Sequence, residues 1–147
     1  MKTNQLTILS VAKALIINAS NEVLILTVGE FKERPDKSFK PDLPGGLVEK
    51  GESELDAVIR EAEEETGIKL NADSTQLVCA DNRVYSEGNE SVSKLLYVSR
   101  LDSNPEVIIS WEHASYEWVP IEDLLEKVKF RAFYQEAIEY CFNNKLL

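Results

Sequence analysis

The 147-residue sequence has little positive charge, one histidine, two cysteines and no long apolar run. Its 16 lysines and arginines are outnumbered by 26 aspartates and glutamates, so the formal net charge at pH 7 is −10. An acidic chain without a basic stripe is repelled by the phosphate backbone of a nucleic-acid polymer. No apolar run approaches the roughly 20 residues of a membrane span. We therefore expect neither a nucleic-acid polymer nor a membrane as partner.

The cysteines and the first residues give no sign of an exported protein. Cys79 falls in a predicted strand and Cys141 in a predicted helix, which is typical of reduced, buried thiols. Residues 1–10 lack the charged start, apolar core and cleavage site of a secretory signal. We therefore expect a soluble, cytoplasmic protein. A chain of this length can bury one substantial core, so we expect residues 1–147 to form a single domain.

Acidic charge is concentrated in one segment. Residues 46–68 contain eight acids and two bases, a net charge of −6. Within this segment Glu61, Glu64 and Glu65 have the spacings i, i+3 and i+4, where like charges on a helix repel by about 0.2–0.5 kcal/mol per pair. Carboxylates gathered in this way are typical of sites for hard cations. The pattern therefore predicts a site for Mg²⁺ or Mn²⁺.

The sequence also marks the two ends of the helix that carries these acids. Ser53 followed three residues later by Asp56 is typical of a helix start, and Gly67 favours a left-handed stop. These signals predict a helix from Glu54 to Thr66. Its apolar residues recur at helical spacing and should pack against the core. They are Leu55, Val58, Ile59 and Ala62.

The turn before this helix is rich in glycine. Pro44-Gly45-Gly46 allows the backbone to approach a ligand closely. It also leaves a carbonyl, such as that of Gly46, available as an additional oxygen ligand for a metal.

Together these residues resemble the Nudix box, the signature of the Nudix hydrolase family. Five residues separate Gly46 from Glu52, and seven more precede Arg60-Glu61. The segment then ends in Glu64-Glu65-Thr66-Gly67-Ile68, so every fixed position of the box is filled over 23 residues. Ala62 occupies a position where the family usually has a larger aliphatic side chain.

The resemblance implies an enzyme that hydrolyses a nucleoside diphosphate linked to another group, by attack of metal-activated water on phosphorus. It implies that Glu61, Glu64 and Glu65 hold the metal ions, with the Gly46 carbonyl as a further ligand. Glu52 would bind through water or steady the cluster, and Arg60 would orient the carboxylates. The expected partner is a small-molecule nucleotide, and the protein is expected to be a monomer or a homodimer.

Apolar, β-branched runs predict the remaining strands. We place strands at residues 11–18, 22–28, 76–85, 92–101 and 116–119. Further helices are expected over 121–127, with Pro120 as a favourable first residue, and over 132–143. This order suggests an α/β fold with a mixed sheet covered by helices on both faces. The Nudix resemblance implies the same α/β/α sandwich with a loop-helix-loop for the box.

Two residues could act as the general base. In the family this role differs between members, and Glu61 within the box is one possibility. Glu112 is the other, because many Nudix proteins carry a carboxylate on the loop before a tryptophan-containing strand; it could also be a solvated loop acid. The adjacent His113 could contact phosphate or the base, since its charge switches near neutral pH. Alternatively, it makes only a loop hydrogen bond.

Contacts to the substrate are expected outside the box. The basic stretch 30–42 includes Arg34 and Lys40, which would hold distal phosphates if this loop folds over the metal site; otherwise it is a solvated insertion. Phe31 and Phe39 of this loop could stack on a base or pin the loop to the core. Tyr85 lies where dinucleoside polyphosphate hydrolases of the family have a tyrosine, although strand tyrosines are often structural.

The substrate expected from these hints is a nucleoside triphosphate or a dinucleoside polyphosphate. ADP-ribose and other nucleotide sugars are the alternative substrates. A different reading is a nucleotide-sensing module that keeps the fold and has lost catalysis. Such a module would be expected to have damaged metal ligands, whereas all of the acids of the box are intact.

Overall fold

The computed structural model describes residues 5–147 and contains one mixed sheet. Its strand order is β3-β2-β1-β6-β5, while β4 pairs with β1 and β7 pairs with β2. The strands are β1 (Thr7–Ile17), β2 (Glu22–Val28), β3 (Pro41–Asp42), β4 (Gly45–Leu47), β5 (Thr75–Tyr85), β6 (Glu90–Arg100) and β7 (His113–Pro120). The helices are α1 (Glu54–Thr66), α2 (Leu124–Lys127) and α3 (Ala132–Asn143). The predicted α/β fold with a mixed sheet is confirmed.

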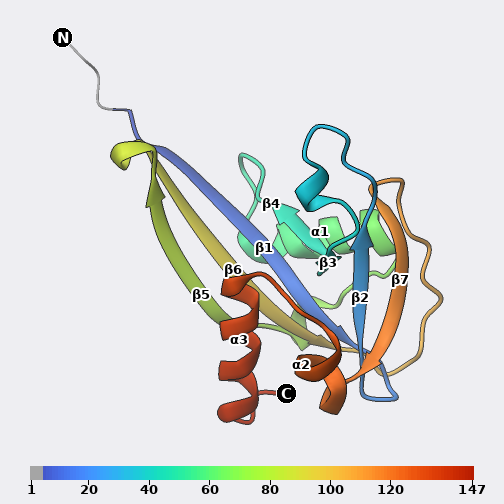
Figure 1. Cartoon of the computed structure of the whole chain (residues 1–147). Coiled ribbons are helices and arrows are strands. Elements are labelled where there is room, and N and C mark those ends of the chain that lie inside the picture. The colour runs from blue at the N-terminus through green and yellow to red at the C-terminus, as the bar shows by residue number, and fades with distance from the viewer. Residues whose placement is uncertain (1–4) are drawn as a thin grey trace.

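Strand β1 organises the sheet, and it separates from β2 soon after the turn that joins them. It pairs in parallel with β6 along its whole length, and β5 pairs antiparallel with β6. The predicted turn between β1 and β2 is present, but the two strands pair only at Ile17 and Val23. Figure 1 shows β1 and β2 meeting at one end and spreading apart toward the other. Beyond the Ile17–Val23 pair, β4 pairs with β1 and β3 pairs with β2. Strand β7 also pairs with β2.

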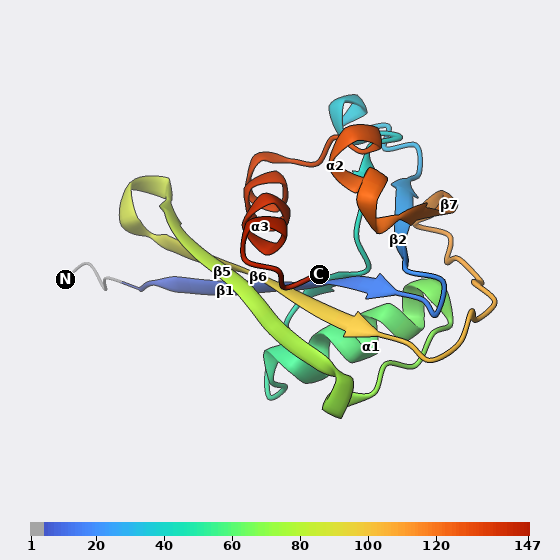
Figure 2. The ribbon, with the colours of Figure 1, turned by 90° about the horizontal axis from the view of Figure 1, so that it is seen from below.

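The helices cover opposite faces of the sheet, and each face has its own core. Figure 2 shows α1 on one side of β1, β5 and β6 and α3 on the other. Because side chains of a strand alternate between faces, Leu15 and Ile17 pack in the cluster of α2 and α3, whereas Ala14 and Ile16 pack in the cluster of α1. All four residues are fully buried. Residues 14–17 of β1 are therefore continuously apolar because both faces of the sheet are covered.

Helix α1 begins and ends where its sequence signals place it. The Ser53 hydroxyl accepts a hydrogen bond from the Asp56 N–H at 3.1 Å, and Gly67 adopts the left-handed conformation with φ of 74°. Val58 and Ala62 are fully buried in the cluster that contains Ala14. Small residues on both the strand and the helix allow α1 to lie close to β1.

The segment after β7 differs from its predicted form. Strand β7 begins at His113, three residues before its predicted start, and Pro120 is its last residue, paired with Glu22. Pro120 has an extended backbone with ψ of 138°, so it cannot begin a helix. The expected helix over 121–127 consists of a 3₁₀ turn, Ile121–Asp123, followed by the single turn of α2. Within residues 5–147, every helix is too short or too polar to span a membrane.

The two cysteines differ in burial, which predicts different reactivity. Both are free; Cys141 is fully buried, whereas Cys79 is half-buried. Burial raises the pKa of the Cys141 thiol to about 11, and the nearby Cys79 adds to the effect. At pH 8 a thiol-specific reagent should therefore modify one cysteine in the native protein and two after denaturation. In a Cys79→Ser variant the native protein should not react, and rapid labelling of that variant would contradict the assigned burial.

Candidate active site

A cleft of about 540 Å³ opens where β2 diverges from β1. Its lining comes from β1, from residues 28–31, from the β3–β4 turn, from α1 and from residues 111–113. Two of the acids that line it, Glu61 and Glu65, come from the Nudix-like helix, and a third is Glu112. The divergence of two strands thus brings together acids that are far apart in the sequence.

Arg60 holds three of the predicted carboxylates. Its Nη2 donates to Glu52 Oε1 at 2.7 Å, and its Nη1 donates to Glu61 Oε1 at 3.1 Å and to Glu64 Oε2 at 3.2 Å. Nη2 also donates to the Leu47 carbonyl at 3.3 Å, which ties the helix to the end of β4. These hydrogen bonds raise the pKa of Arg60 and lower the pKa of Glu52. The orienting hydrogen bonds expected of Arg60 are therefore present.

Glu65 lies in a different environment from Glu64. The Glu64 side chain is 59% exposed, whereas that of Glu65 is 5% exposed and accepts a hydrogen bond from the Gly45 N–H at 3.3 Å. Burial raises the pKa of the Glu65 carboxyl to about 9; the charge of Lys13 lowers this pKa, whereas the hydrogen bond to Glu61 and the charge of Asp42 raise it. Glu65 therefore retains its proton near neutral pH unless a cation takes the place of that proton.

The two glycines of the turn permit this close packing. Gly45 has φ of 137°, and a Cβ at this position would lie 2.1 Å from the Ala12 carbonyl oxygen. A Cβ on Gly46 would lie 2.9 Å from the Glu61 carboxyl carbon. The backbone of Gly46 thus lies directly against the Glu61 carboxylate, an approach that only glycine allows.

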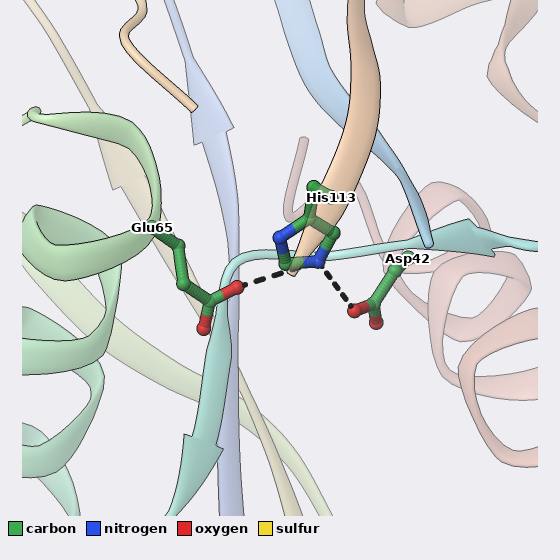
Figure 3. Close-up of side chains that lie close together, drawn as sticks. All are labelled: Asp42, Glu65 and His113. Atoms are coloured by element: carbon green, nitrogen blue, oxygen red, sulfur yellow. Dashed lines mark hydrogen bonds and ion pairs between the residues drawn. The ribbon is translucent and has the colours of Figure 1, made fainter. Parts of the chain in front are cut away.

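His113 is buried between two acids at the back of the cleft, as Figure 3 shows. Its Nε2 lies 3.1 Å from Asp42 Oδ2 and 3.6 Å from Glu65 Oε2. One ligand atom from each of these three residues lies within 4.8 Å of the others, a grouping that could hold a metal ion. His113 is the first residue of β7 and does not belong to the preceding loop. Its side chain contacts the acids inside the site.

Asp42 also pairs with Lys13 on β1. Lys13 Nζ lies 2.6 Å from Asp42 Oδ1 and donates to the Leu43 carbonyl at 3.1 Å. Burial alone would raise the pKa of Asp42, but hydrogen bonds and charges from His113 and Lys13 reverse this effect and lower the pKa to about 2. Lys13, Asp42, His113 and Glu65 thus form a chain of polar contacts from β1 to α1.

The loop before β7 is fastened to the end of α1. The Ile108 and Ser110 N–H groups donate to the Thr66 and Glu65 carbonyls at 3.0 and 3.1 Å. These are carbonyls of the last helical turn, which need partners outside the helix. The Glu112 carbonyl accepts from the Gly29 N–H at 3.0 Å. These bonds bring Glu112 to the cleft, where both possible bases, Glu61 and Glu112, are found.

Three predicted substrate contacts lie elsewhere. Arg34 is exposed and pairs with Asp36, 3.3 Å away, within its own loop. Lys40 lines a second hollow of about 310 Å³ together with Lys37, Lys129 and Arg131. Tyr85 lines a third hollow, of about 260 Å³, with Arg83, Lys94 and Arg131. The two basic hollows share Arg131, and neither includes an acid of the box.

Sequence reasoning missed Lys13, Asp42 and Trp111, all of which line the cleft. One signal was available, because Lys13 is a lone charge within the apolar run of β1. Such a charge is buried only when it has a partner. The sequence contains no sign that this partner is Asp42, 29 residues later.

The fold and the box now have a match among known proteins. The family model described as the NUDIX domain matches residues 8–141. The chain belongs to the Nudix family. Nudix domains bind small nucleotides and typically depend on a divalent metal, and the described residues include a group, Asp42, Glu65 and His113, that could hold such an ion.

Curated and solved Nudix relatives resemble this chain at low identity. It is 31% identical over 94 residues to the bis(5'-nucleosyl)-tetraphosphatase (asymmetrical) of Mus musculus, and the matched region covers 60% of each chain. It is 29% identical over 83 residues to the enzyme of that name from Caenorhabditis elegans, covering 56% of this chain and 60% of that one. The crystal structure of the MutT protein from Methanosarcina mazei Go1 has a TM-score of 0.77 at 27% identity and covers 95% of this chain and 96% of its own. The chain thus spans about 60% of the length of the two curated relatives.

The low pKa of Asp42 predicts an acid-sensitive contribution to stability. Because the folded-state pKa of about 2 lies below the ordinary 3.8, the ionised pair favours the folded state by about 2 kcal/mol above pH 4, and this is lost as the pH falls toward 2. Asp42→Asn should remove this contribution and leave Lys13 unpaired. Urea unfolding in chelator should show a loss of at least about 2 kcal/mol at pH 7 that narrows by pH 3.

Asp36→Asn is the matched control. Asp36 belongs to the same stretch and also pairs with a basic residue, but that pair is exposed and contributes little. A loss for Asp42→Asn that does not change with pH would contradict the assigned pairing.

Proposed function

We propose that this Nudix hydrolase is a Mg²⁺-dependent pyrophosphohydrolase that cleaves a nucleoside diphosphate linked to another group, with a dinucleoside polyphosphate or a nucleoside triphosphate as substrate. The observation that carries this proposal is the Glu61–Glu65 pair, which lies in the cleft against the backbone of Gly45 and Gly46. We also propose that residues 1–147 act as one domain, since both faces of a single sheet contribute to the cores around the cleft.

The residues of the cleft fit a hard divalent cation. Glu61 and Glu65 are in hydrogen-bond contact, and the buried Glu65 has a pKa near 9. A cation would replace the proton on Glu65 and stabilise the two carboxylates. Glu61, Glu64 and Glu65 would hold the ions together with the Gly46 carbonyl, and Glu52 would act through water or through Arg60. When bound, Mg²⁺ or Mn²⁺ supplies neutralisation of the phosphate charge and a water of lowered pKa.

The general base is Glu61 or Glu112, and the contacts of the two side chains differ. The Glu61 carboxylate already accepts a hydrogen bond from Arg60 and contacts Glu65, so its oxygens are engaged with other residues. The Glu112 side chain is exposed, lines the cleft and has no hydrogen bond to another residue within 5–147. A base must be free to take a proton from water, which favours Glu112.

The basic hollows favour a substrate with a long phosphate chain. Six of the chain's 16 basic residues line these two hollows, although the chain as a whole is strongly acidic. Lys40 lies two residues from Asp42 of the cleft, so the basic surface begins beside the catalytic groups. We propose that Lys40 and Tyr85 contact the distal phosphates or the second nucleoside, which agrees with the activity named for the two curated relatives. Nucleotide sugars such as ADP-ribose, which have a shorter phosphate chain, are the second possibility.

A metal-dependent hydrolysis screen tests the function. The screen should include nucleoside triphosphates, dinucleoside polyphosphates, ADP-ribose and NADH, each with Mg²⁺ or Mn²⁺, with products separated by chromatography. We expect one dominant class of substrate and a fall in kcat of at least about a hundredfold for Glu65→Gln, because a ligand of the reacting centre is lost.

Glu63→Gln is the control for this variant. It removes the same charge from the same helix, but Glu63 is exposed and does not line the cleft. Equal activity of the two variants would refute the metal assignment. Tight nucleotide binding without turnover by the wild-type protein would instead favour a sensing module.

The dependence of kcat on pH should distinguish the two possible bases. A general base must be ionised, so the rate falls on the acidic side of its pKa, and removal of the base removes this acidic limb. We expect Glu112→Gln to flatten the acidic limb at a reduced rate. Glu61→Gln should lower the rate at every pH and weaken Mn²⁺ binding in calorimetry. If the two variants exchange these behaviours, Glu61 is the base.

A further inference from the structure

Trp111 is a large aromatic side chain exposed to water beside a charged cleft. It is 91% exposed and lines the same cleft as Glu61 and Glu65. Phe31, which is 45% exposed, lines the cleft from the loop between β2 and β3. The other tryptophan, Trp118, is half-buried and packs against the core on the α1 side. Exposed aromatic residues gathered at a cleft are typical of a binding surface.

Backbone hydrogen bonds hold both aromatic residues in place. Ser110, before Trp111, donates to the Glu65 carbonyl at 3.1 Å, and Glu112, after it, accepts from Gly29 at 3.0 Å. The Phe31 N–H donates to Ser38 Oγ at 2.7 Å. The backbone on each side of Trp111 is therefore fixed, on one side to the helix that carries Glu61 and Glu65. An aromatic ring attached to a fixed backbone loses only its side-chain freedom on binding, which lowers the entropic cost.

We propose that Trp111, together with Phe31, stacks on the nucleobase of the nucleotide whose phosphates reach Glu61 and Glu65. This inference rests on the proposed function and names the part of the substrate that the cleft recognises. Every nucleobase has a flat π-face, although the hydrogen-bonding groups on its edge differ. Stacking therefore selects nucleotides over inorganic polyphosphates and tolerates different nucleobases. A volume of about 540 Å³ is within the range of small-ligand sites.

The charges around the rings support an uncharged mode of recognition. Glu30, Asp42 and Glu112 line the cleft in addition to the two acids of the helix, and Lys13 is the one lysine or arginine that lines it among the described residues. This base is already paired with Asp42 at 2.6 Å. Acidic walls repel phosphate until a cation binds, whereas stacking on a ring needs no charge.

Stacking far from the reacting phosphorus should affect binding more than chemistry. The same contact exists in the substrate complex and in the transition state, so its loss raises KM and leaves kcat unchanged. With diadenosine tetraphosphate as substrate, Trp111→Ala should raise KM about tenfold or more, with kcat within about twofold of the wild type. Trp111→Phe should keep most of the affinity, because phenylalanine retains a ring.

Ile108→Ala is the matched control for this kinetic test. Ile108 is an exposed apolar residue of the same loop, 68% exposed, and it does not line the cleft. Its KM should equal that of the wild type. A loss of kcat in Trp111→Ala without a change in KM would overturn the proposal, because it would place Trp111 in the chemical step.

Tryptophan fluorescence gives a readout that is independent of turnover. Trp118→Phe leaves Trp111 as the single tryptophan, and Trp111→Phe leaves Trp118. In Mg²⁺, a non-hydrolysable methylene analogue of ATP should quench the first protein and not the second. Tripolyphosphate, which has the phosphates without a base, should bind and leave Trp111 fluorescence unchanged.

The outcomes separate this inference from the function on which it rests. If both ligands inhibit hydrolysis equally and neither quenches Trp111, stacking is overturned and the metal site stands. If only the nucleotide quenches Trp111 and binds more tightly than tripolyphosphate, stacking is supported. If neither ligand binds or inhibits in Mg²⁺, the proposed function fails, and the stacking proposal fails with it.

Discussion

Mutual repulsion among carboxylates is the constraint around which this structure is organised. Arg60 is bonded to Glu52, Glu61 and Glu64, and it reaches the backbone of Leu47 as well. A single guanidinium can do this because it presents five donors in a rigid plane. Arg60 thus offsets the repulsion on the exposed side of the helix. On the buried side, no lysine or arginine among the described residues bonds Glu65; its partners include the Gly45 N–H at 3.3 Å and His113 Nε2 at 3.6 Å. Burial raises the pKa of this acid, so it would keep its proton or take up a cation.

The divergence of β1 and β2 turns that helix into a site. If the two strands paired along their whole length, β4 could not pair with β1, and its glycines would not reach the helix. In the structure Gly45 lies so close to Ala12 that any side chain would overlap the strand, and its N–H bonds Glu65. Strand β7 pairs with the other edge of β2, and the side chain of its first residue, His113, lies between Asp42 and Glu65. The site therefore depends on one early departure from regular pairing.

Local signals predicted the helices better than the site. The ends of α1 follow from Ser53 and Gly67 because capping is decided within a few residues, and the bounds of α3 were also as predicted. The contacts of the site join residues far apart in sequence, such as Asp42 and His113, which are separated by 71 positions. No local pattern encodes such a pairing. The basic loop shows the same limit, because its composition allowed either a phosphate clamp or a solvated insertion and did not show that Arg34 bonds Asp36 two residues away.

The distribution of charge sets an order of events on this surface. The cleft is acidic and its only lining lysine is paired within the described residues, whereas the two hollows around Arg131 are basic. A polyphosphate approaching the apo-protein is therefore drawn to the hollows and repelled by the cleft. In the proposed function, binding of a cation to Glu61 and Glu65 would remove that repulsion and make the cleft accessible to the scissile phosphates. The net charge of −10 then does not oppose an anionic substrate, because attraction and repulsion act at different places on the molecule.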